Sequence, residues 1–255
     1  MKKLLALLIA IFIPFSNSVV LASDNNGIVS SETKIEKLKE YGIVNCYEDG
    51  NFYPDKNITR AEFCKLISTI LSMPANYDNT TKYFSDVPTE HWANEHITFC
   101  YENGLIQGTS EPKKICFVDV DEYGNETDIT EPIDIYGNGI SNITKGIFEP
   151  DENVVYQDAL KILVNALGYK EKALQRGGYP QGYITVATEI GILSSSRPAY
   201  SDYITREVAA EIVYNALYVP LMISYVDGDA TIYITADGKD GRELQTLYQK
   251  YFNEN

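Results

Sequence analysis

Three imperfect repeats constrain this chain more than any other feature of its 255 residues. The pattern Glu-x-Gly followed by two apolar residues occurs at 40–44, 102–106 and 189–193. Each copy follows a segment with helical periodicity, and its glycine stands where a left-handed C-terminal cap is expected. After each copy come a loop and a second amphipathic segment, at 58–73, 154–169 and 204–217. The sequence therefore predicts a helix-loop-helix unit that occurs three times.

Residues 1–22 have the layout of a secretory signal peptide. Lys2 and Lys3 precede an apolar run, and Val20 and Ala22 put small residues at positions −3 and −1 of a cleavage site. The apolar run is too short for a convincing membrane span. We expect an exported, soluble protein that does not insert into a membrane once the leader is removed.

The net charge argues against nucleic acid and anionic lipid as partners. The chain has 21 basic and 36 acidic residues, a net charge of −15, and loss of Lys2 and Lys3 makes it −17. A surface of this sign repels polyanions, so an anionic ligand needs a local basic pocket. We expect no cofactor and no metal, because the two histidines, His91 and His96, stand five residues apart and match no zinc motif.

The four cysteines allow disulfides in an exported protein. Cys64 and Cys100 occupy apolar positions of helical patterns, so we expect free thiols in the core at both. A bridge between Cys46 and Cys116 is left open.

Two further segments depart from the helical repeats. An insertion spans roughly 109–146, where the alternation of ICFVDV before Tyr-Gly-Asn predicts a β-hairpin. A calcium loop over 119–130 is disfavoured, because Tyr123 and Thr130 occupy positions that need oxygen ligands and a glutamate. Residues 220–255 predict a strand, a turn, a strand and a short helix.

The stretch ITRAEF offers a helix start and an unexplained cation. Thr59 and Glu62 form a capping box, which accounts for both residues. Arg60 follows at the first helical position, where a cation opposes the helix dipole. Arg206 follows Thr205 in the same way, although that helix lacks the capping glutamate. We interpret the arginine with the helix-start amides as an anion site.

The middle unit lacks this pattern. Val155-Tyr156-Gln157-Asp158 replaces Thr-Arg-Ala-Glu, which removes both the cap and the cation. We expect an inactive site there, with Tyr156 serving as an ordinary buried or surface tyrosine.

The stretches FSDVPTEHWA (84–93), GLIQG (104–108) and ITRAEF (58–63) resemble the S-layer homology (SLH) modules of bacterial cell-surface proteins. The resemblance covers most of 31–219. It implies a mainly α fold, a pseudo-threefold bundle of three helix-loop-helix modules, to which the chain adds the β-hairpin insertion and the C-terminal α/β tail. The expected modules are 31–75, 83–170 and 173–219.

The resemblance also implies a function and a set of residues. Such modules bind secondary cell-wall polysaccharide, often pyruvylated, and hold exported proteins on the wall or S-layer surface. The implied groove pairs Arg60 with an acidic sugar substituent, uses Asp86 to orient hydroxyls, and is supported by Trp92 from a packed module interface. Arg206 serves a second groove. The expected ligand-binding residues are Thr59, Arg60, Asp86, Trp92, Thr205 and Arg206.

Two other functions stay open at this point. A degenerate SLH fold can bind another exported protein, which the damaged middle unit and the absence of a cargo region after the tail would favour. The abundance of Asp and Glu leaves room for a cell-envelope glycan hydrolase. The reading that best fits the motifs is non-catalytic attachment to wall polysaccharide.

Overall fold

The computed structural model describes residues 29–77, 80–109, 117–120, 126–129, 146–227, 230–239 and 241–252. The predicted leader, Cys116 and most of the predicted insertion lie outside these ranges.

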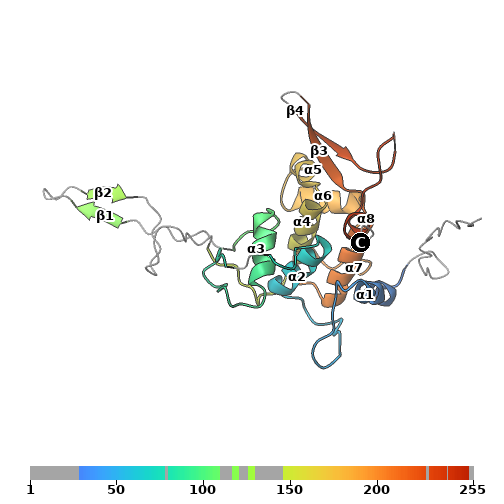
Figure 1. Cartoon of the computed structure of the whole chain (residues 1–255), viewed down its shortest axis with the longest axis horizontal. Coiled ribbons are helices and arrows are strands. Elements are labelled where there is room, and N and C mark those ends of the chain that lie inside the picture. The colour runs from blue at the N-terminus through green and yellow to red at the C-terminus, as the bar shows by residue number, and fades with distance from the viewer. Residues whose placement is uncertain are drawn as a thin grey trace, which may run out of the picture.

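Three central helices, one from each repeat, contact one another (Figure 1). They are α2 (Arg60–Ile70), α4 (Tyr156–Ala166) and α7 (Arg206–Leu217). An outer helix packs on each of them: α1 (Ser31–Glu40) on α7, α3 (Asn94–Glu102) on α2, and α6 (Gln181–Glu189) on α4. Every outer helix thus covers the central helix of a different repeat, so the first and last repeats close a ring.

A cycle of three backbone hydrogen bonds joins the loops that lead into the central helices. The amide of Ile58 donates to the carbonyl of Ile204 at 3.1 Å, Ile204 donates to Val154 at 3.0 Å, and Val154 donates to Ile58 at 3.0 Å. All three side chains are buried. The cycle fixes the starts of the three helices relative to one another.

The predicted apolar stripes form the core. Phe63, Ile67 and Ile70 of α2 are completely buried, and burial of each such side chain contributes about 1.5–3 kcal/mol. Leu160 and Leu163 of α4 are completely buried as well. The three repeat glycines have positive φ, as the cap prediction requires, at Gly42, Gly104 and Gly191.

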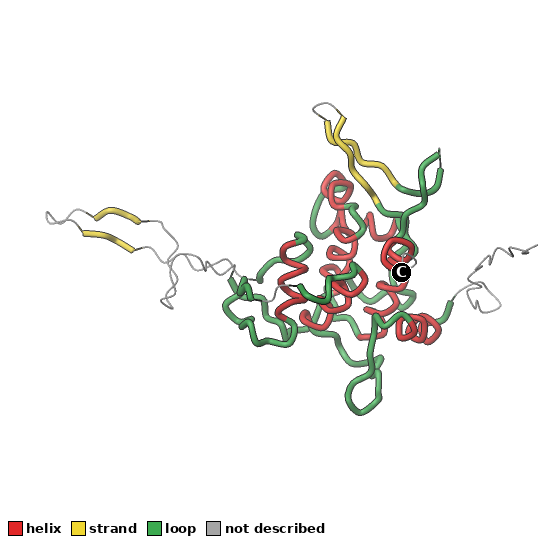
Figure 2. Tube along the Cα trace, viewed as in Figure 1, coloured by secondary structure: helices red, strands yellow, loops and turns green. Residues whose placement is uncertain are grey.

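Two antiparallel hairpins accompany the helices. The insertion contains β1 (Phe117–Val120) paired with β2 (Glu126–Ile129), which confirms the predicted hairpin. The tail contains β3 (Met222–Asp227) paired with β4 (Ala230–Thr235), which projects from the helical body (Figure 2). The mainly helical fold class is therefore confirmed.

Two short helices complete the described chain. α5 (Lys170–Gln175) packs on α6, and α8 (Leu247–Phe252) contacts α2 and α7. The Thr246 hydroxyl accepts the Gln249 amide at 3.1 Å and caps the start of α8. No helix among the described residues has the length and apolarity to cross a membrane.

The cysteine predictions are confirmed where the structure describes them. Cys64 and Cys100 are free and buried, and the Cys100 thiol donates to the Cys64 carbonyl at 3.6 Å. Cys46 is free and exposed, whereas its suggested partner, Cys116, lies outside the described residues.

Candidate functional site

Two pockets lie at equivalent places beside the central helices. The first, called the Arg60 groove, has a volume of about 430 Å³, and its polar and aromatic lining includes Arg60, Gln107, Phe148, Asp158, Lys161 and Tyr179. The second, called the Arg206 groove, has a volume of about 170 Å³, and its lining includes Asn45, Tyr47, Glu62, Lys65, Trp92 and Arg206. In each groove an arginine that begins one central helix lies near a lysine from the next central helix.

Backbone carbonyls and an aromatic face hold the Arg60 guanidinium. Its Nε donates to the Phe148 carbonyl at 2.8 Å, and its Nη2 lies 3.4 Å from the Gln107 carbonyl. The guanidinium carbon lies 4.4 Å from the centroid of the Phe148 ring. No carboxylate of the described residues forms an ion pair with Arg60. Its position is therefore fixed, while no described carboxylate is close enough to pair with its positive charge.

The lining of the Arg60 groove also contains an exposed aromatic ring. Tyr179 is 48 % exposed, and its hydroxyl donates to Asp158 Oδ1 at 2.7 Å. Desolvation, followed by this hydrogen bond, raises the pKa of Tyr179 to about 12, so the phenol remains a donor at neutral pH. The Lys161 ammonium lies 5.2 Å from the centre of the ring. The lining of this groove thus combines an exposed aromatic ring with two cations, Arg60 and Lys161.

The Arg206 groove repeats the same arrangement. Arg206 Nε donates to the Phe52 carbonyl at 2.9 Å, and Nη2 donates to the Asn45 carbonyl at 3.0 Å. The guanidinium carbon lies 4.7 Å from the Phe52 ring centroid and 4.5 Å from that of Tyr47. Trp92 takes the place that Tyr179 has in the other groove and is 53 % exposed.

One contact distinguishes the Arg206 groove from its counterpart. Arg206 Nη1 lies 3.5 Å from Glu62 Oε1. The same carboxylate accepts the Tyr47 hydroxyl at 2.8 Å and the Thr59 amide at 3.0 Å. Glu62 is thus held from three sides and places a fixed negative charge against Arg206.

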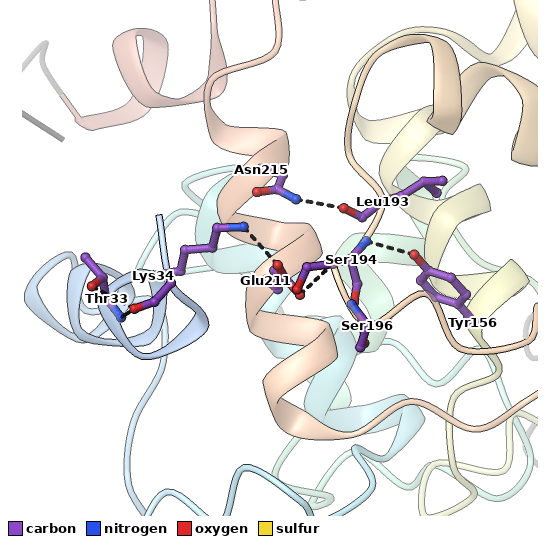
Figure 3. A network of polar contacts seen from close by, with 10 residues as sticks. Thr33, Lys34, Tyr156, Leu193, Ser194, Ser196, Glu211 and Asn215 are labelled. Carbon is purple, nitrogen blue, oxygen red and sulfur yellow. Dashed lines mark hydrogen bonds and ion pairs between the residues drawn. The ribbon is translucent and has the colours of Figure 1, made fainter. Parts of the chain in front are cut away.

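The third equivalent place is filled by the protein itself (Figure 3). Tyr156 is buried, and its hydroxyl accepts the Ser194 amide at 2.9 Å. Glu211, at the position equivalent to the groove lysines, accepts the Ser195 amide at 3.0 Å and pairs with Lys34 at 2.9 Å. The expectation that Tyr156 is an ordinary buried residue is confirmed.

The helix starts hold their predicted caps but not the predicted anion site. Thr59 accepts the Glu62 amide and the Glu62 side chain accepts the Thr59 amide, which confirms the capping box. Thr205 likewise caps α7. The amides of Arg60 and Ala61, however, donate to carbonyls of the 150–152 loop at 2.8 and 2.9 Å. The prediction that helix-start amides bind an anion is wrong, because another repeat already satisfies them.

Asp86 lies behind the Arg60 groove rather than in its lining. Its two carboxylate oxygens accept the amides of Phe148 and Glu149 at 2.8 and 2.7 Å. Asp86 therefore fixes the loop whose carbonyl holds Arg60.

Trp92 differs from its prediction in both surroundings and partner. It is exposed, not packed in a module interface, and it lines a groove with Arg206 instead of Arg60. The structure therefore does not bring Arg60, Asp86 and Trp92 together around one cavity.

Sequence reasoning missed the lysines and Tyr179. Tyr179 stands ten residues before Glu189, as Trp92 stands ten before Glu102, so an alignment of the repeats contains the signal. Lys65 and Lys161 each follow the helix start by the same five residues. In the sequence of a single repeat, nothing marks the lysine or the tyrosine as a groove residue, because each groove is completed by a neighbouring repeat.

The chain is similar to surface proteins of bacteria. The family model described as "S-layer homology domain" matches residues 28–64 and 83–112. The "Cell surface protein" of Thermoanaerobacter kivui is 28 % identical over 197 residues, which cover 76 % of this chain and 21 % of the relative. The "Middle cell wall protein" of Brevibacillus brevis is 24 % identical over 196 residues, 75 % of this chain and 15 % of the relative.

The "Cellulosome-anchoring protein" of Acetivibrio thermocellus is 34 % identical over 80 residues, 29 % of this chain and 17 % of the relative. The chain spans about a fifth or less of the length of each of these three relatives.

Proposed function

We propose that this chain, which is similar to S-layer homology domain proteins of the cell surface, attaches to the cell wall by binding secondary wall polysaccharide. The observation that carries the proposal is the guanidinium of Arg60, which pairs with no described carboxylate, is fixed by two carbonyls and is exposed to a pocket beside Lys161 and Tyr179. Sugar sites generally combine an aromatic face with a few fixed polar groups. A cation adds affinity for an acidic substituent, such as a pyruvyl carboxylate.

The binding unit is the assembled ring of three modules, at 31–75, 83–170 and 173–219. In the Arg60 groove the arginine comes from the first module, Lys161 from the second and Tyr179 from the third. No module alone carries the full set. The Arg206 groove is a second site, and the third place is filled by Tyr156 and Glu211, so we propose two sites per chain.

The proposed attachment is non-catalytic, as is typical of S-layer homology families. Glycan is held through the cations and aromatic faces, and no bond is broken. The glycan hydrolase considered from the sequence gains no support from the groove residues, whose carboxylates accept hydrogen bonds or form an ion pair within the protein.

Cosedimentation with purified cell walls tests the proposal. The protein should sediment with untreated walls and remain in solution when the secondary polysaccharide has been stripped from them. Equal sedimentation with stripped walls would overturn polysaccharide binding. Incubation of the released glycan with the protein should leave its chain length unchanged, and shortening would revive the hydrolase.

A protein-binding role is the second candidate. The C-terminal hairpin exposes Tyr225, Val226 and Tyr233, of which Val226 is 74 % exposed, and such side chains favour contact with another protein. Sedimentation that persists with stripped walls and disappears after protease treatment of the walls would support this role instead.

A further inference from the structure

The two grooves hold their arginines alike but differ in whether a carboxylate pairs with the arginine, and we propose that they accept different parts of the glycan. The Arg60 groove takes the anionic substituent, and the Arg206 groove takes an uncharged sugar ring. The inference rests on the proposed function, because it assigns a ligand class to each of the two proposed sites.

The charge of Arg206 is already matched inside the protein. Its side chain is 11 % exposed and that of Glu62 is 19 % exposed, with 3.5 Å between Nη1 and Oε1. Glu62 cannot turn away without losing its bonds to the Thr59 amide and the Tyr47 hydroxyl. An incoming carboxylate would meet the fixed charge of Glu62 at short range, which opposes the attraction of Arg206.

The corresponding carboxylate in the Arg60 groove is directed elsewhere. Asp158 occupies the position equivalent to Glu62 but accepts the Tyr179 hydroxyl instead of pairing with Arg60. The Lys161 ammonium lies on the same side, 5.2 Å from the Tyr179 ring centroid. An anion between Arg60 and Lys161 therefore meets two cations that belong to two different central helices.

The exposed indole of Trp92 in the Arg206 groove suits a neutral sugar. Trp92 is the largest exposed aromatic side chain there, and its indole stacks on His91 with 5.8 Å between ring centroids. That contact supports the ring from one side while leaving it half exposed. An aromatic face of this kind packs against the apolar face of a sugar ring without requiring a charge.

The fluorescence of Trp92 tests the assignment directly, because Trp92 is the only tryptophan in the chain. The probes are purified wall polysaccharide and the same material with its carboxyl groups reduced to alcohols. In the Arg60→Ala variant, both probes should change the fluorescence with half-saturation values within about twofold of each other, since the Arg206 guanidinium is already paired with Glu62. In the wild type, native polysaccharide should bind more tightly than the reduced form.

Glu62→Gln in the Arg60→Ala background provides the matched charge test. Glutamine preserves the capping box, but the substitution removes the negative charge that pairs with Arg206. Preference for native over reduced polysaccharide, read from Trp92, should rise roughly two- to fivefold, the factor that a partly exposed ion pair contributes. Glu40→Gln, made in the same background, removes the negative charge of an exposed carboxylate that pairs with Lys37 and lines neither groove, and it should leave this preference unchanged.

Two results would overturn the inference while leaving the proposed function intact. One is a Trp92 response in the Arg60→Ala variant that requires carboxyl groups. The other is a Trp92 fluorescence that polysaccharide does not change, although the wild type sediments with walls and the Arg60→Ala variant does not. Failure of the wild type to sediment with any walls would overturn the proposed function and, with it, this assignment.

Discussion

The ammonium of Lys34 and the carboxylate of Glu211 lie 2.9 Å apart although 177 residues separate them in the chain. Lys34 belongs to α1 and Glu211 to α7, so the pair ties the first repeat to the last (Figure 3). Both side chains are buried, with 11 % and 3 % exposure. The closure of the ring thus includes a buried charge pair.

Removing one partner should destabilise the protein strongly. Glu211→Leu should lower the free energy of unfolding by roughly 3–5 kcal/mol, because it leaves the Lys34 ammonium buried without a counter-charge. The double variant Lys34→Met/Glu211→Leu should recover most of this loss. Urea unfolding measures both. Glu40→Ala, which breaks the exposed Lys37–Glu40 pair on the same helix, is the control and should leave the urea midpoint unchanged.

The same pair should make stability depend on pH. Burial disfavours the charged form of Glu211, but the bonds from Lys34 and the Ser195 amide outweigh it, so its pKa lies below the usual 4.5. A group with a lowered folded-state pKa stabilises the fold above its unfolded-state pKa and loses that contribution as the pH falls through the folded-state value. The stability difference between wild type and Glu211→Gln should therefore be full at about pH 7 and shrink below about pH 4.5. A difference that grows on acidification would contradict this assignment.

Gly168 should tolerate no side chain. It has φ +84°, and a Cβ there would lie 2.1 Å from the Met222 carbonyl oxygen, where the tail returns to α4. Gly42→Ala provides the comparison, since Gly42 has φ +70° with open space around it. The control should cost roughly 1–2 kcal/mol from backbone strain alone, and Gly168→Ala roughly 1–3 kcal/mol more from the clash. Equal midpoints in urea for the two variants would show that the tail adjusts freely.

Arg60→Ala should weaken wall attachment without unfolding the protein. A charge-assisted hydrogen bond contributes about 1.5–3 kcal/mol, so affinity for walls should fall roughly tenfold or more. Cosedimentation gives the affinity, and circular dichroism checks the fold. Arg176→Ala is the control, because Arg176 is 53 % exposed, pairs with Glu189 and lines neither groove. Unchanged retention of the Arg60 variant would contradict its role.

Cys46 should report occupancy of the Arg206 groove. Its thiol is exposed and lines that groove, whereas Cys64 and Cys100 are buried, and burial raises the pKa of the Cys100 thiol. In a Cys116→Ser variant, one thiol should react rapidly with an alkylating reagent, and wall polysaccharide should slow that reaction. Denaturation should make all three remaining thiols reactive. Alkylation at the same rate with and without polysaccharide would place the ligand elsewhere.

Local features of this protein follow from the sequence because they depend on neighbours along the chain. The capping box of Thr59 and Glu62, the positive φ of Gly42 and the apolar stripe from Phe63 to Ile70 all arise within one helix or turn. The two hairpins follow from alternation and turn residues in the same way. Each of these features needed only the periodicity and chemistry of a few adjacent residues.

The grooves depend on contacts between repeats, and no single segment contains that information. Arg60 is recognisable in the sequence as a cation at a helix start, but its helix-start amides are used by the loop at 150–152. Trp92 was expected beside Arg60 and lies beside Arg206, because each outer helix packs on another repeat's central helix. The Glu62 carboxylate has two roles. It completes the local capping box of α2, and it pairs with Arg206, a contact that forms only when the first and third repeats pack together.

The sequence by itself determined the number of repeats, the bounds of the three central helices to within a few residues and the arginines that distinguish two of them. Only the tertiary structure decided which aromatic ring and which lysine face each arginine, and that Glu62 compensates one guanidinium while Asp158 leaves the other free. The physical reason is range: hydrogen-bonded turns and apolar periodicity act over a few residues, whereas charge balance in a groove depends on side chains that folding brings together from distant parts of the chain.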